Sequence, residues 1–254
     1  MLPEHPCKIT AYIMSRMLTR LREWKERWLA HRLLSKFVFR GALCFDVGAN
    51  IGDITDLFLK LGARVVAVEP QAENVSRMER RFSSRPHLTL VAKAIGAEDG
   101  SAELLVCNAS DCSSLSAEFA ATLSRSGRVP PTYKWDQRQT VDVTTLDALI
   151  ARFGTPDFVK IDVEGYEAEV LKGLSHPLPA VSFEYTPERL QPTLDCIAHL
   201  VALGSYEFNF TVGREHRLVL SGWISATDIA RELKNREFQR IIGPGGDVYA
   251  RLAG

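Results

Sequence analysis

From residue 41 onward the sequence alternates short apolar runs with amphipathic stretches, and this alternation constrains the fold most strongly. Residues 42–48 and 64–70 are apolar runs that end at a glycine and a proline, and residues 53–62 between them carry apolar side chains at helical spacing. Parallel strands buried on both faces are nearly continuous apolar runs, and the helices between them cover the sheet. The pattern predicts an α/β fold with a mostly parallel sheet and helices on both faces.

The same alternation continues along the rest of the chain. Apolar runs predict strands, and helical spacing predicts helices near residues 75–82 and 192–201 and in other segments. The strands are expected at 88–92, 156–165, 180–187, 207–212, 216–223 and 247–252, and the other helices at 143–154, 166–174 and 227–234. Residues 94–107 are expected to form a turn and an extended run, and the Ser-rich residues 108–138 a loop.

The summed charge is zero, but basic residues are concentrated at the start of the chain. Thirty-one Lys and Arg residues balance thirty-one Asp and Glu residues, so the net charge gives no reason to expect nucleic-acid binding. Residues 1–40 contain nine basic and three acidic side chains, a net charge of plus six that leaves minus six on the remainder. We expect residues 1–40 to form a helical extension and residues 41–254 to form one domain.

The N-terminal extension is expected to be a basic amphipathic helix. Met14, Leu18, Leu21 and Trp28 lie near one face of that helix, and Arg and Lys side chains occupy its other sides. Such a helix suits an anionic membrane surface or a partner protein. The simpler expectation is packing against its own domain or against a second copy in a homodimer, and these alternatives stay open.

Cysteine spacing and the lack of long apolar segments bear on the compartment. The five cysteines include no CxxC pair and no His/Cys cluster at metal-ligand spacing, as expected for reduced thiols. The first ten residues lack the apolar core of a signal peptide, and no run approaches the roughly 18 apolar residues of a membrane span. We therefore expect a cytoplasmic protein.

A glycine turn follows the first strand in the stretch CFDVGANIGDIT. Gly48 and Gly52 suit a close backbone approach to a ligand, and Asn50 stands where a dinucleotide-binding turn has its middle glycine. The missing glycine argues against a nicotinamide or flavin dinucleotide. Asp46, two residues before the first glycine, would repel a pyrophosphate and would attract an ammonium group.

The second strand ends in Glu69, seventeen residues after Gly52. A carboxylate at this place can accept hydrogen bonds from both hydroxyls of a ribose. An amino-acid head near Asp46 and a ribose near Glu69 together describe S-adenosylmethionine, which we predict as the cofactor. The simpler alternative is that Asp46 ends the strand, the glycines only allow tight packing and Glu69 is solvated.

Several stretches resemble the FkbM family of S-adenosylmethionine-dependent methyltransferases. They are FDVGANIGDIT, VVAVEP, VTTLDALI, DFVKIDVEGYEAEVLKGL and VSFEYT, and the similarity runs from about residue 42 to 251. The resemblance implies a class I methyltransferase fold, with a Rossmann-like seven-stranded sheet whose last strand is antiparallel. It also implies that Asp46, Gly48, Asn50 and Gly52 line the methionine and ribose, that Glu69 holds the ribose, and that Ala94 and Ile95 border the adenine.

Two carboxylates near the predicted site suit the acceptor side of the reaction. Asp162 in the stretch DFVKIDVEG and Glu184 in SFEYT should lie at the carboxyl ends of neighbouring strands, where ligands of open α/β sheets bind. Either one could accept the proton of an alcohol or position it. Asp162 is also the nearest partner for Lys160, and Glu164 is expected to begin the following helix. Mg²⁺ held by paired carboxylates is an alternative, but we predict no metal site.

These residues predict an enzyme, an S-adenosylmethionine-dependent O-methyltransferase. The acceptor, a hydroxyl of a sugar, a glycan or another secondary metabolite, rests on the family resemblance alone. An RNA methyltransferase is the first alternative, opposed by the neutral net charge. A non-catalytic protein that binds S-adenosylmethionine is the second, opposed by the presence of Asp162 and Glu184.

Overall fold

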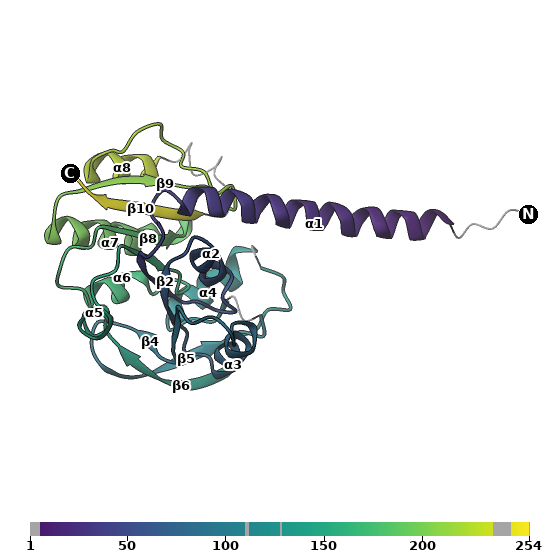
Figure 1. Ribbon diagram of the computed structural model, residues 1–254, viewed down its shortest axis with the longest axis horizontal. Coiled ribbons are helices and arrows are strands. Elements are labelled where there is room, and N and C mark those ends of the chain that lie inside the picture. The colour runs from purple at the N-terminus through teal and green to yellow at the C-terminus, as the bar shows by residue number, and fades with distance from the viewer. Residues whose placement is uncertain (1–5, 110–111, 128, 236–244, 254) are drawn as a thin grey trace, which may run out of the picture.

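A computed structural model describes residues 6–109, 112–127, 129–235 and 245–253, and it contains the expected seven-stranded sheet (Figure 1). The strand order is β3-β2-β1-β7-β8-β10-β9, and all pairs are parallel except those made by β10. The predicted fold class, with an antiparallel last strand, is therefore confirmed. The strands are β1 (Leu43–Val47), β2 (Arg64–Val68), β3 (Leu88–Val91), β7 (Phe158–Ile161), β8 (Ala180–Tyr185), β9 (Tyr206–Phe210) and β10 (Gly246–Leu252).

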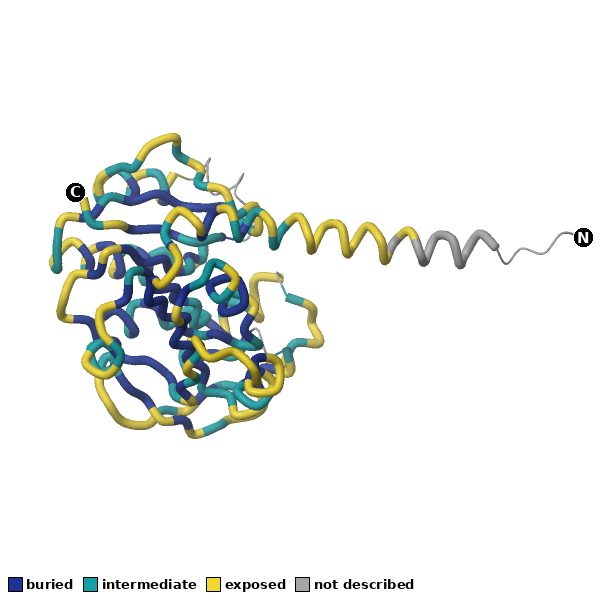
Figure 2. The backbone as a smooth tube through the Cα atoms, in the orientation of Figure 1, coloured by how far each residue is buried: buried dark blue, intermediate teal, exposed yellow. Residues whose placement is uncertain are grey.

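Helices cover both faces of this sheet because side chains alternate along each strand. On β1, Cys44 belongs to one buried cluster and Phe45 to another. The Cys44 cluster contains residues of α2 (Asp53–Lys60) and α3 (Ala72–Arg81). The Phe45 cluster contains residues of α5 (Leu146–Phe153), α6 (Glu167–Lys172), α7 (Leu190–Leu203) and α8 (Ala226–Lys234). Buried backbone fills the centre of the domain in Figure 2.

A second, smaller sheet lies beside the first and has the order β4-β6-β5. It consists of β4 (Ala94–Ile95), β5 (Gly100–Val106) and β6 (Gln137–Thr144). The extended run predicted within residues 94–107 is thus confirmed, whereas β6 was not predicted. It pairs in parallel with β4 and antiparallel with β5.

Two expectations about local structure were wrong. The predicted loop at residues 108–138 contains α4 (Ala117–Ser126), whose first turn is capped by the Ser116 hydroxyl accepting from the Phe119 N–H. A serine N-cap satisfies an otherwise unpaired amide, and this favours a helix within a Ser-rich stretch. The predicted strand at residues 216–223 is irregular, although Val219 N–H still donates to the Phe210 carbonyl.

The helix α1 (Pro6–Leu34) projects from the domain, and Figure 1 shows its N-terminal end far from the sheet. Among its described side chains, Ala30, Leu33 and Leu34 are buried in the cluster formed by α2 and α3, and Arg27 pairs with Asp56 of α2. These turns therefore pack against the domain, as expected, and the boundary at residue 40 stays a prediction. None of the described helices has both the length and the apolar character to cross a membrane.

Candidate active site

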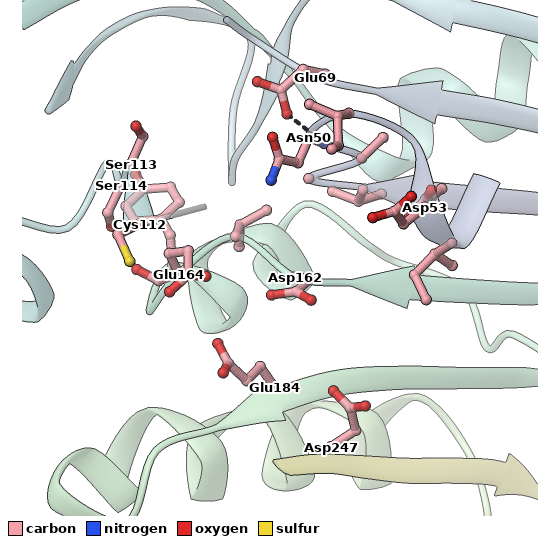
Figure 3. A pocket seen from close by; sticks show the side chains of 18 of the residues that line it. Asn50, Asp53, Glu69, Cys112, Ser113, Ser114, Asp162, Glu164, Glu184 and Asp247 are labelled. Atoms are coloured by element: carbon pink, nitrogen blue, oxygen red, sulfur yellow. Dashed lines mark hydrogen bonds between the residues drawn. The ribbon is translucent and has the colours of Figure 1, made fainter. Parts of the chain in front are cut away.

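A cavity of about 1080 Å³ opens at the carboxyl ends of β1, β2, β7 and β8. Residues 112–115, two residues of α4, and residues of the segments 213–216 and 245–247 also line it. All of the site residues predicted from the sequence except Gly52 line this cavity. In the view of Figure 3, Glu69 and Glu184 lie on opposite sides of Asp162. The cavity therefore has a β2 side and a β8 side.

In the glycine turn that follows β1, every second residue has a positive, left-handed φ angle. Gly48 has a φ of 82°, Asn50 of 49° and Gly52 of 84°. A Cβ atom on Gly48 would lie 1.8 Å from the carbonyl oxygen of Asp162, so the turn touches the backbone that follows β7. Only glycine fits both this approach and this φ. Gly52 lies against the Phe82 side chain, and it precedes α2.

Glu69 at the end of β2 fixes the same turn from the other side. Its Oε2 accepts the Asn50 N–H at 2.9 Å and its Oε1 accepts the Gln71 N–H at 2.9 Å. Burial raises the pKa of Glu69, and the N–H groups of Gln71 and Asn50 oppose that rise. Asn74 Nδ2 also donates to Oε1, at 3.4 Å, so Oε2 is the oxygen better placed to accept from a ligand.

Asp46 lies under the turn, where it is almost fully buried. Its Oδ2 accepts from the Thr55 hydroxyl at 2.5 Å, which joins the end of β1 to the first turn of α2. Burial raises the pKa of Asp46 to about 6, against the opposing effects of Thr55 and Lys160. Asp46 therefore supports the turn in addition to lining the cavity.

Ala94 and Ile95 form β4 and line the cavity next to Glu69 and Lys93. Both are buried, and β4 is held in place by its parallel pairing with β6. Their side chains supply an apolar part of the cavity wall. Their expected contact with the adenine stays a prediction.

Lys160 joins the acidic residues on the other side of the cavity. Its Nζ donates to Asp162 Oδ2 at 3.2 Å, as the sequence predicts, and to Asp247 Oδ1 at 2.9 Å. Burial by itself would lower the pKa of Lys160, but the charges of Asp162 and Asp247 raise it well above its usual value. The lysine is therefore a fixed cation whose charge is balanced within the cavity wall.

Glu184 on β8 has no comparable partner. Its Oε2 is buried and accepts no hydrogen bond from the described residues. Burial, together with the charges of Asp162 and Glu167, raises the pKa of Glu184 well above its usual value. An unpartnered, buried carboxyl group with a raised pKa has a high affinity for a proton.

Asp162, Glu164 and Glu184 form a carboxylate cluster, in which one oxygen of each lies within 4.8 Å of the others. The structure thus brings Asp162 and Glu184 together, as expected. Carboxylate oxygens are ligands that Mg²⁺ prefers, but proximity alone does not distinguish a cation site from a proton-accepting site. The expectation that no metal is bound stays a prediction.

Comparison with known families identifies this arrangement. The model of the methyltransferase FkbM domain matches residues 46–211, which run from the aspartate before the glycine turn to the end of β9. The chain belongs to the FkbM methyltransferase family. The resemblance seen in the sequence is therefore confirmed.

One curated relative of this chain is the hexuronic acid methyltransferase AglP of Haloferax volcanii. The two are 27% identical over 166 residues, which are 65% of this chain and 63% of the relative. The match thus spans less than two thirds of the relative's length.

Solved structures of other methyltransferases are also similar, at 10% identity. Precorrin-6y C5,15-methyltransferase of Geobacter metallireducens matches with a TM-score of 0.47, over 89% of this chain and 87% of the other. A TehB-like S-adenosylmethionine-dependent methyltransferase of Corynebacterium glutamicum matches with 0.45, over 94% and 99%. At such scores the likeness adds nothing to the fold read from the strand order.

The candidate active site contains functional candidates that the sequence did not predict. Asp247 is distant in sequence and reaches Lys160 because β10 inserts beside β8. Glu167, rather than Glu164, begins α6, and its Oε1 accepts the N–H groups of Val163 and Gly165. Glu164 precedes the helix with a φ of 55°. The sequence signal that could have identified Glu167 is its place as the second acid of VEGYE, because an acidic residue is favoured in the first turn of a helix.

Proposed function

We propose that this chain is an S-adenosylmethionine-dependent methyltransferase. It transfers a methyl group to a hydroxyl oxygen of a sugar, and the sugar belongs to a glycan or a related secondary metabolite. The observation that carries the proposal is Glu184, whose Oε2 is buried at the cavity without a hydrogen-bond partner among the described residues. A hydroxyl must lose a proton as it is methylated, and a group with this proton affinity suits that step. The relative named for hexuronic acid supports a sugar acceptor.

The residues on the β2 side fit S-adenosylmethionine. Asn50 Oδ1 is buried without a hydrogen-bond partner among the described residues, so it can accept from a ligand. Gly48 leaves room for a close approach, and the fixed Oε2 of Glu69 can accept from a ribose hydroxyl. Asp46 adds negative charge for the ammonium group. When bound, the cofactor supplies an electrophilic methyl group on a positively charged sulfur.

The residues on the β8 side would handle the acceptor. Glu184 would take the hydroxyl proton on its free oxygen while the hydroxyl oxygen forms its bond to the methyl carbon. The electron pair of the carbon–sulfur bond would go to sulfur, so a neutral thioether would leave. Asp162, held by Lys160, would orient the hydroxyl. Alignment of the two reactants is the main contribution expected from the protein.

The test is an acceptor screen with the full chain and S-adenosylmethionine. Oligosaccharides containing hexuronic acid, neutral oligosaccharides and transfer RNA are each incubated with the enzyme, and S-adenosylhomocysteine is quantified. The product is then treated with mild alkali, which removes a methyl ester and leaves a methyl ether. A sugar product stable to alkali is the expected result.

Other results would overturn parts of the proposal. A methyl group lost in alkali would mean that a carboxylate was methylated, and a carboxylate needs no base. Turnover of RNA alone would point to an RNA methyltransferase. Saturable binding of S-adenosylmethionine without turnover of any acceptor would support a non-catalytic protein.

A further inference from the structure

The exposed part of α1 carries a stripe of large apolar side chains, which we call the α1 stripe. Between 49% and 67% of each is exposed, although large apolar residues are normally covered in a folded protein. Figure 2 shows this part of the helix as exposed along its length. The residues of the stripe are Met14, Met17, Leu18, Leu21, Trp24 and Trp28.

The α1 stripe faces away from the domain. With 3.6 residues per turn, its members fall on one side of the helix, and residues 30, 33 and 34 fall on the opposite side. Those three are the ones buried against the domain. The stripe extends for about 21 Å along the helix, at about 1.5 Å per residue from residue 14 to residue 28. It is therefore a continuous outward surface that the domain leaves uncovered.

Positive charges lie on and beside the α1 stripe. From residue 14 to 34 there are six Lys or Arg and two Asp or Glu. Helical spacing sets Lys25 and Arg32 within the stripe and Arg20 at its border, while Glu23 lies on the side facing the domain. The Arg32 guanidinium lies 5.7 Å from the centroid of the Trp28 ring. The outward side of the helix is thus both apolar and basic.

This charge pattern disfavours a second copy of the helix as the occupant. In a parallel coiled coil with residues 14, 21 and 28 in the seam, Arg20 of one copy would face Lys25 of the other. In the antiparallel arrangement positions 20 and 27 would face each other, and both are arginine. Both pairings set like charges together.

We infer that the α1 stripe docks on the surface of a lipid bilayer that contains anionic headgroups. Apolar side chains enter the boundary between headgroups and acyl chains, and the tryptophans occupy the depth that indole rings prefer. Lys25 and Arg32 bury their stems in the stripe and extend their charged ends to the phosphates. Lipid supplies apolar and anionic partners within one surface, as the stripe requires.

The test is co-sedimentation of the full chain with vesicles, without cofactor or acceptor. Vesicles made of equal parts of phosphatidylcholine and phosphatidylglycerol are compared with vesicles of phosphatidylcholine alone. We expect binding to the anionic vesicles, weakened by added salt, and a blue shift of tryptophan emission as Trp24 and Trp28 leave water.

A matched pair of variants isolates the stripe. Leu21→Glu places a negative charge within the stripe, and Thr19→Glu places the same charge about 200° around the helix. Both substitutions change the net charge equally, so both should weaken the electrostatic attraction to anionic lipid to a similar extent. Leu21→Glu should weaken vesicle binding at least about tenfold more than Thr19→Glu. Only the first substitution removes an apolar side chain that the bilayer would bury. Neither residue contacts the buried core, and circular dichroism verifies the fold.

Three results would overturn the inference. The first is absence of binding to anionic vesicles at low salt. The second is equal weakening by the two variants, which would mean that charge alone acts. The third is dimerisation in light scattering that Leu21→Glu abolishes and Thr19→Glu preserves, which would assign the stripe to a second copy. Because the assay involves no methyl transfer, its failure is separate from failure of the proposed function.

Discussion

The ammonium of Lys160 lies 2.9 Å from Oδ1 of Asp247, although β8 separates the strands that carry them. Lys160 also reaches Asp162 beyond the end of its own strand. One buried side chain thus ties β7 to β10 across β8, on the side of the cavity assigned to the acceptor. Its loss would leave two carboxylates without their shared cation.

Lys160→Met should lower the free energy of unfolding by about 3 kcal/mol, because removing one partner of a buried ion pair leaves an uncompensated charge. Urea denaturation followed by circular dichroism measures this. Lys172→Met is the control, since Lys172 makes an exposed pair with Glu169, and it should change stability by less than about 0.5 kcal/mol. An equal change in the free energy of unfolding for the two substitutions would contradict a structural role for Lys160.

Glu69→Gln should weaken S-adenosylmethionine binding about 10- to 100-fold, as expected for losing hydrogen bonds to a charged group. The amide has only one accepting oxygen, so its NH₂ group would face either Asn50 N–H or Gln71 N–H. Calorimetric titration measures the affinity. Glu73→Gln, on the exposed surface of α3, is the control and should bind normally. Unchanged affinity in Glu69→Gln would separate this residue from the cofactor.

Glu184→Gln should lower turnover about 10²- to 10⁴-fold if Glu184 is the base. Since burial raises its pKa, the wild-type rate should rise with pH through a value above that of an ordinary glutamate. The variant should lose this dependence and keep its affinity for the cofactor. The pH profile of turnover under saturating acceptor measures both effects, and an identical profile in the variant would assign the base elsewhere.

Asp162→Ala should chiefly lower turnover and leave cofactor affinity near the wild-type value, because its side chain faces the acceptor side. Removing this carboxylate also takes one partner from Lys160, so stability is measured in parallel. Single-turnover kinetics and calorimetry on the same preparation separate the two effects. A large loss of cofactor affinity with normal turnover would reverse the assignment.

Glu167 should make the protein less stable as pH rises from about 4.5 to about 7. Burial raises its pKa to about 7, so the folded state binds a proton that the unfolded state releases in this window. The shift from 4.5 corresponds to about 3 kcal/mol at most. Glu167→Gln can keep both accepted N–H groups on Oε1 and should flatten this part of the pH dependence. Denaturation of the wild type and of Glu167→Gln at pH 5 and pH 8 tests this. An equal change in the free energy of unfolding between the two pH values in both proteins would contradict the prediction.

Local sequence patterns predicted the main sheet and the β2 side of the site well, because strands, turns and caps depend on neighbours in the chain. Asp46, Gly48 and Glu69 are each tied to the end of a strand. Asp247 escaped prediction because its role depends on the insertion of β10 beside β8, a contact between residues 87 positions apart. The α4 helix was not predicted because a serine that caps a helix is hard to distinguish, in the sequence, from the serines of a Ser-rich loop.

The approach of Gly48 to the carbonyl of Asp162 joins the two halves of the cavity through backbone atoms. In the proposed reaction, this main-chain contact would help to fix the distance between the cofactor side and the acceptor side of the cavity. Residues of α4 and of the segment 213–216 line the cavity without forming this contact, so substitutions there are expected to leave that distance unchanged. In such a scaffold, recognition of the acceptor and alignment for transfer can evolve independently.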